Sequence, residues 1–143
     1  MFEDLKFEWL FLIATFSVFI VYSDIKHRKV SNKLCLLIAV LCAGYAFTYT
    51  EVQVLIPITI LVIGIVLSYL RILGGGDTKL LAAYFTAISP DVFLATLIVI
   101  GISGGVLSLI YLLKNKIKKN TNSNLPYAIP ITIGGLIGIL ASM

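Results

Sequence analysis

Charged residues are scarce in this 143-residue sequence, where Lys, Arg, Asp and Glu together make up only 13% of the chain. A soluble domain carries roughly 25% charged residues. Hydrophobic residues reach 59%, and the mean hydropathy is +1.05. One small globular core cannot hide so much apolar surface from water. The composition therefore predicts a protein that uses lipid as the solvent for much of its surface.

Several motifs of catalysis and binding are also missing. The single histidine, His27, lies in a basic stretch, and no G-x-S-x-G supports a serine hydrolase. The glycine-rich stretch leads into Asp-Thr-Lys, which excludes a phosphate-binding P-loop. Cys35 and Cys42 form no C-x-x-C pair, so we expect no metal site and no cofactor. The net charge of +4 lacks the interleaved aromatic residues of nucleic-acid binding, so no nucleic-acid partner is expected.

Long uncharged runs predict an all-α, polytopic membrane protein with about six transmembrane helices in one membrane-embedded domain, residues 1–143. A crossing needs about 20 apolar residues. The fourth run has 11, or roughly 16 Å of helix, so it either starts near Asp77 or penetrates only partway. The period-two alternation of membrane strands is absent. The predicted spans are residues 7–23, 34–50, 52–73, 77–90, 92–113 and 126–142.

The basic residues predict the orientation of these spans. With the N-terminus outside, ten of the 11 basic residues fall in the predicted cytosolic loops 24–33, 71–79 and 114–119. The positive-inside rule then favours a multi-pass protein of the inner (cytoplasmic) membrane. Five of the seven acidic residues lie on the opposite side, so Asp24 and Asp77 are the only carboxylate side chains expected on the cytosolic face.

These two aspartates are the candidate catalytic pair. Asp24 ends the first predicted span and Asp77 begins the fourth, which puts both at the same depth. Ionisable residues at the edge of the hydrocarbon tend to mark functional sites. Two close carboxyls share one proton, so that one acts as base on a water while the other donates to a substrate carbonyl. The helix ends favour the proton on Asp24 unless nearby cations reverse that preference.

Each aspartate also has a simpler interpretation. Asp77 is a good helix N-cap after a glycine turn, and Asp24 has Arg28 as an ion-pair partner one helical turn later. Both interpretations would have to hold at the only two cytosolic acids. Three consecutive glycines also carry an entropic cost, which an extended substrate lying against bare backbone would explain. The candidate substrate-binding residues are Gly74, Gly75, Gly76 and Lys79.

Three stretches of the sequence resemble motifs of a known family. Residues 74–79, Gly-Gly-Gly-Asp-Thr-Lys, are similar to the G-x-G-D-x-K signature of the type IV prepilin peptidases, a branch of the GxGD membrane aspartic proteases. The stretch from Asp24 to Leu34 resembles the first-aspartate segment of that family, D-x3-R-x-I-P-N, with Ser31 in place of the proline. Residues 125–130 are similar to the proline–tyrosine stretch before the last helix of the family.

The resemblance implies a membrane aspartic endopeptidase that uses Asp24 and Asp77, without a cofactor, to cleave the N-terminal leader of type IV prepilin-like precursors at the cytosolic membrane face. Larger family members carry an N-terminal domain with paired C-x-x-C motifs and methylate the product. The chain instead resembles the short, peptidase-only branch of Tad-type (Flp) pili, so no methyltransferase activity is expected. The implied partners are a prepilin-like substrate with a basic leader and the lipid bilayer, and the oligomeric state stays open.

Two other function classes compete with a protease. A small proton-coupled carrier would use the aspartates as a relay, but transporters place such residues near the midplane, often at broken helices. Both acids here lie at an edge. A non-catalytic assembly subunit of a secretion or pilus system would tolerate the loss of both aspartates, whereas a protease would lose all processing.

Overall fold

The computed structural model describes residues 1–119 and 125–143, and these residues form six α-helices and no strand. The predicted all-α fold class is therefore confirmed. The helices are α1 (Phe2–His27), α2 (Asn32–Tyr49), α3 (Leu55–Tyr69), α4 (Gly75–Phe85), α5 (Pro90–Lys118) and α6 (Ala128–Ser142).

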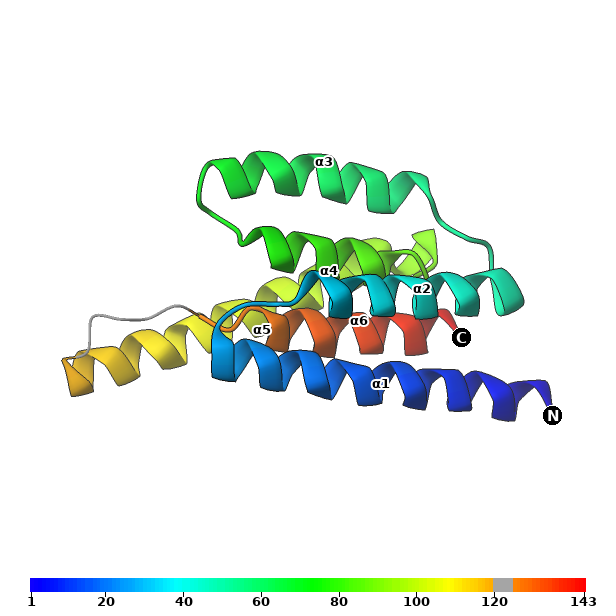
Figure 1. The fold of residues 1–143 in the computed structure, drawn as a ribbon, viewed down its shortest axis with the longest axis horizontal. Helices are drawn as coiled ribbons and strands as arrows, with labels where there is room; N and C mark the ends of the chain where they lie inside the picture. The colour runs from blue at the N-terminus through cyan, green and yellow to red at the C-terminus, as the bar shows by residue number, and fades with distance from the viewer. Residues whose placement is uncertain (120–124) are drawn as a thin grey trace.

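The helices lie side by side, with α4 in the middle of the arrangement (Figure 1). α4 packs against α2, α3 and α6, while α1 packs against α2 and α6, and α5 packs against α6. The α1–α2 and α3–α4 connections lie at one end of the bundle, and both chain termini lie at the other. The segments that carry Asp24 and Asp77 therefore meet at the same end.

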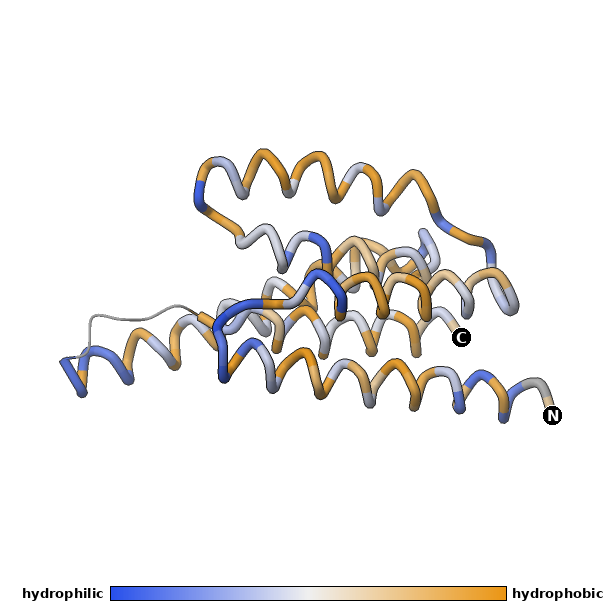
Figure 2. The backbone as a smooth tube through the Cα atoms, in the orientation of Figure 1, coloured by the Kyte–Doolittle hydropathy of each residue, from blue (hydrophilic) through white to orange (hydrophobic). Residues whose placement is uncertain are grey.

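The exterior of the bundle is apolar between hydrophilic ends. Large side chains such as Phe11 and Phe47 are 76% and 84% exposed on the outward faces of α1 and α2. Figure 2 shows hydrophobic residues along the middle of the helices and hydrophilic residues in the connections at their ends. Contiguous apolar surface of this extent is rare on soluble monomers, and it fits a molecule surrounded by lipid.

Three helices among the described residues are long and apolar enough to cross a membrane: Glu3–His27, Asn32–Tyr49 and Pro90–Lys118. α3 and α6 are shorter apolar helices of 15 residues each. α4 has 11 residues, or roughly 16 Å at 1.5 Å per residue, about half of a bilayer core. It ends at Phe85 because the chain turns before Pro90, the first residue of α5.

Some helix ends differ from the predicted spans for local reasons. α3 ends at Tyr69, where the Arg71 N–H donates to the Ser68 carbonyl at 3.0 Å and the Ile72 N–H donates to the Leu67 carbonyl at 2.9 Å. This is a Schellman closure, with Arg71 in the left-handed region at φ 58. α5 continues to Lys118 because lysines near a helix C-terminus complement its dipole.

Glycines bring α4 close to its neighbours. A Cβ atom at Gly64 of α3 would collide with the Thr78 side chain, and one at Gly135 of α6 would lie 2.6 Å from the ring of Tyr84. Side chains this close would need backbone shifts, so the glycines permit the tight packing of α3 and α6 on α4. At Gly101 and Gly105 of α5, no atom of residues 1–119 and 125–143 lies within 4 Å of such a Cβ, so their spacing does not serve packing among these helices.

Candidate active site

Asp24 and Asp77 line one open cleft of about 710 Å³ at the end of the bundle that holds the α1–α2 and α3–α4 connections. Its walls come from the end of α1, the α1–α2 connection, the turn between α3 and α4, and the segment before α6. Besides the aspartates, the lining residues are Arg28, Lys29, Val30, Ser68, Arg71, Ile72, Leu73, Gly74, Gly75, Gly76, Leu125 and Tyr127.

Asp24 lies in the last turn of α1 and is only 6% exposed. The backbone N–H of Ala128 donates to its Oδ2 atom at 3.2 Å. Ala128 is the first residue of α6, and N–H groups in the first turn of a helix have no partner within that helix. Burial and the negative end of α1 disfavour the charged form of Asp24, and the positive end of α6 partly offsets them.

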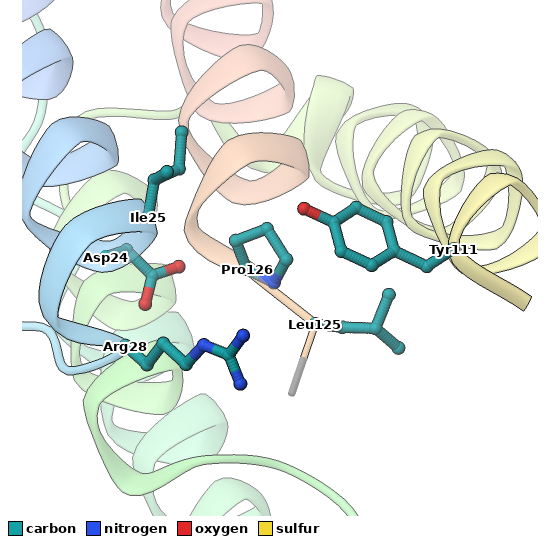
Figure 3. Close-up of a pocket in the computed structure, with 6 residues that line it drawn as sticks. All are labelled: Asp24, Ile25, Arg28, Tyr111, Leu125 and Pro126. Carbon is teal, nitrogen blue, oxygen red and sulfur yellow. The ribbon is translucent and has the colours of Figure 1, made fainter. Parts of the chain in front are cut away.

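A second, smaller cavity adjoins Asp24. Its volume is about 80 Å³, and it is lined by Asp24, Ile25, Arg28, Tyr111, Leu125 and Pro126. Figure 3 shows Arg28 beside Asp24, with Pro126 of the segment before α6 and the Tyr111 ring of α5 on the opposite side. This polar, partly enclosed space leaves room beside the Asp24 carboxyl for water, which a hydrolytic base requires.

Asp77 is the third residue of α4, and Gly74 occupies the N-cap position. The Thr78 N–H donates to the Gly74 carbonyl at 3.1 Å, and the Thr78 hydroxyl donates to the same oxygen at 3.2 Å. The turn is thus closed by Thr78, and the simpler interpretation of Asp77 as the helix cap does not describe this geometry.

The Asp77 carboxyl is half-buried at the end of this short helix. Burial, and secondly the nearby charge of Asp24, raise the pKa of Asp77 to about 6. Both causes disfavour its charged form. The two carboxyls are therefore close enough for the ionisation of one to affect the other.

The three glycines of the signature line the same cleft as the aspartates. None of them has a positive φ, so conformational freedom is not what this turn demands. Glycine fits here because neighbouring atoms leave little room for a Cβ atom at two of these positions. A Cβ atom at Gly74 would lie 2.7 Å from Oδ2 of Asp77, and one at Gly76 would lie 3.2 Å from the Cβ of Val30.

Lys79 is placed differently from the glycines. Its Nζ atom donates to Oδ1 of Asn32 at 3.1 Å. Its side chain lines a separate, mostly apolar groove of about 470 Å³ between α2, α3 and α4, not the cleft of the aspartates. Of the four predicted substrate-binding residues, Lys79 is thus the one that the structure places outside that cleft.

Other residues of the site were not singled out from the sequence. Ser68 in the last turn of α3 and Arg71 just after that helix line the cleft because α3 ends at Tyr69. The Ala128 N–H can bind Asp24 because α6 begins at Ala128. In the sequence, Pro126 indicates a helix start nearby, since proline is favoured at the first positions of helices. No residue pattern linked Ala128 with Asp24, because 104 positions separate them.

The helical fold and the apolar exterior define this chain as an all-α membrane protein. The sequence profile of the type IV leader peptidase family matches residues 11–113, a range that includes both aspartates and the glycine turn. The chain therefore belongs to the type IV leader peptidase family, and its activity is that of a peptidase of this type. Neither a curated protein nor a solved structure matches the chain.

Proposed function

We propose that this chain is an aspartic endopeptidase that removes the N-terminal leader of type IV prepilin-like precursors, of the Flp/Tad kind, at the cytosolic face of the inner membrane. The observation that carries the proposal is that Asp24 and Asp77 line one cleft and that the charge of Asp24 helps to raise the pKa of Asp77. One acid and one base at the same place are what peptide hydrolysis by water requires.

The surroundings suggest how the two carboxyls divide the work. Asp24, held by the Ala128 N–H, is the base that takes a proton from water as the water oxygen attacks the scissile carbonyl carbon. Asp77, whose pKa burial and the charge of Asp24 raise to about 6, holds the one proton that the pair shares and gives it to the carbonyl oxygen. When the tetrahedral intermediate collapses, Asp24 returns its proton to the leaving nitrogen, the C–N bond breaks, and Asp77 regains a proton from the hydroxyl of the new carboxyl.

The position of the cleft suits a precursor whose scissile bond adjoins an apolar helix. The cleft opens at an end of the bundle, where the hydrophilic connections meet the apolar helix surfaces (Figure 2). An extended peptide can lie there against the bare backbone of Gly74–Gly76 and meet water, while the apolar part of the precursor stays in lipid. Peptidase activity without methylation, and without a cofactor, is the proposed chemistry.

The test is cleavage of a precursor by the purified protein in proteoliposomes. Asp24→Asn and Asp77→Asn should each lower the rate by about 10²–10⁴-fold, the usual contribution of acid–base catalysis. Asp91→Asn, at the first turn of α5 and outside the cleft, should leave the rate unchanged. Wild-type rates in either cleft variant would refute the proposal, and absence of any product with the wild type would favour a carrier or an assembly subunit.

A further inference from the structure

The stretch that follows Asp24 and the turn that carries Asp77 meet along a seam of three contacts. Val30 faces Gly76, whose missing side chain makes room for it. The Cys35 thiol donates to the Gly76 carbonyl, with 3.7 Å between sulfur and oxygen. The Lys79 ammonium donates to the Asn32 side-chain oxygen at 3.1 Å. This seam is where the α1–α2 connection and α2 fix the position of α4.

The Lys79 contact differs from the other two because it joins two side chains, 47 positions apart, through a charged donor. A charged donor makes a hydrogen bond stronger than a neutral one does, and this bond lies at the exposed surface of the bundle. Asn32 is the first residue of α2, and Lys79 lies in the first half of α4. The bond therefore connects the starts of the two helices that follow the two catalytic segments.

Helix geometry keeps Lys79 away from the chemistry. Residues two apart on a helix lie about 200° apart around its axis, so Lys79 and Asp77 point to different sides of α4. Lys79 accordingly lines the groove between α2, α3 and α4, whereas Asp77 lines the cleft. A cation on that side is poorly placed to contact the scissile carbonyl, but it is well placed to fix α4 to the start of α2.

The residue after Asp77, Thr78, packs against Gly64 of α3, but the turn before Asp77 has few restraints of its own. The three residues before Asp77 are glycines, which offer no side chains for packing. Asp24, in contrast, is nearly fully buried and is fixed to α6 by the Ala128 N–H. The separation of the two carboxyls therefore depends mainly on how the start of α4 is held.

We propose that Lys79 is a positioning residue, whose hydrogen bond to Asn32 sets the separation of Asp24 and Asp77. The inference rests on the proposed function of these two aspartates. It predicts that loss of the bond impairs the chemical step and leaves substrate binding almost unchanged. A misplacement of about 1 Å is enough to cost about 10²-fold in rate.

The experiment measures kcat and KM for precursor cleavage in proteoliposomes with a double-mutant cycle. Lys79→Met keeps the aliphatic stem and removes the donor, and Asn32→Leu removes the acceptor. Each should lower kcat by about 10–100-fold with KM within about twofold, and the double variant should be no slower than the slower single one. Lys79→Arg and Asn32→Asp, which keep the donor and the acceptor, should retain most of the activity.

Lys33→Met is the matched control, because it removes a neighbouring exposed lysine that makes no hydrogen bond or ion pair within residues 1–119 and 125–143. It should leave kcat and KM unchanged. Thermal melting of every variant shows whether it is folded, and if Lys79→Met fails to fold, the comparison of Asn32→Leu with Asn32→Asp carries the test.

Two results would overturn the inference. A raised KM with unchanged kcat in Lys79→Met would make Lys79 a substrate-binding residue, and losses that multiply in the double variant would mean that Lys79 and Asn32 act separately. Failure of the proposed function looks different, because then the wild type would yield no product or Asp77→Asn would cleave normally.

Discussion

Asp24 and Asp77 are held by opposite kinds of restraint. Asp24 is enclosed by neighbouring side chains and accepts a hydrogen bond from the start of α6. Asp77 stands on a turn of glycines, and its carboxyl approaches the backbone of Gly74 so closely that a Cβ atom there would lie 2.7 Å from Oδ2. At the scale of single residues, the geometry of the pair depends on the close contacts around Asp24 and on the absence of a side chain at Gly74 beside Asp77.

This difference predicts the effect of a single methyl group. Gly74→Ala should push the Asp77 carboxyl out of position and lower cleavage by about 10-fold or more. The change in stability should be small, because the displaced atom is the end of a side chain and the Gly74 backbone (φ −71, ψ 140) suits alanine. Cleavage rate and melting temperature, measured on the same preparation, separate these two effects.

The control for that substitution is Gly101→Ala, which adds the same methyl group where no atom of the described part of the chain lies within 4 Å. It should leave the cleavage rate unchanged and should not lower the melting temperature, because alanine is favoured over glycine inside a helix. Full activity in Gly74→Ala would contradict the close approach between Gly74 and the Asp77 carboxyl.

The two aspartates could be predicted from the sequence because charge is rare in this chain, and only two acids were expected on the basic side. The reason for the glycine run could not be predicted. That the glycines bind the substrate stays a prediction, and the sequence does not reveal that Gly74 and Gly76 also have close neighbours within the protein, Asp77 and Val30. Such neighbours depend on how α2 and α4 pack, which no local pattern contains.

At the scale of helices, the short α4 determines where the site lies. It packs between α2, α3 and α6, and it carries Asp77 at one end and buried side chains such as Tyr84 and Phe85 at the other. The Tyr84 hydroxyl also makes a buried hydrogen bond with Ser17 of α1. Since α4 touches so many neighbours, a change at one helix contact should be transmitted to Asp77.

Gly64→Ala tests this transmission. The new methyl group would overlap the Thr78 side chain, next to Asp77, and α3 and α4 would have to separate. Overpacking of this kind typically costs about 1–3 kcal/mol, so the melting temperature and the cleavage rate should both fall. Gly105→Ala, where a methyl group meets no atom of the described residues within 4 Å, should lower neither quantity, because alanine is favoured over glycine inside a helix. A Gly64→Ala protein as stable as the wild type would contradict the packing of α3 on α4.

The existence of the helices followed from the sequence better than their ends and faces did. Uncharged runs predicted each helix, because lipid requires apolar segments with internally satisfied backbone. The early end of α3 depends on a Schellman closure in which Arg71 takes the left-handed position. Glycine usually occupies that position, so the sequence carried no signal for this helix end. The Gly101 and Gly105 pair has the spacing of a packing motif, yet it faces outward, since spacing alone does not tell which face meets a neighbour.

At the scale of the whole molecule, both termini lie at the end opposite to the cleft (Figure 1). We expect the cleft to face the cytosol, because the basic residues gather at its end. Single cysteines test this, in a chain whose buried Cys35 and Cys42 are replaced by alanine. An impermeant maleimide added to spheroplasts should label Glu3→Cys and not Lys116→Cys, and inside-out vesicles should show the reverse.

Labelling of Lys116→Cys from the outside would contradict the proposed orientation. A permeabilised sample, in which both cysteines react, is the control for reactivity. The measurement concerns orientation alone and does not depend on whether a substrate is known.

The most direct test of the account is the titration of Asp77 in the intact protein, followed by NMR of ¹³C-labelled aspartate, with Asp77→Asn used to assign the signal. We predict a pKa of about 6 in the wild type and a lower pKa in Asp24→Asn, because that variant removes the nearby negative charge but keeps the burial. An Asp77 that titrates at the ordinary value of an aspartate, or that is unaffected by Asp24→Asn, would contradict a carboxyl pair that shares one proton.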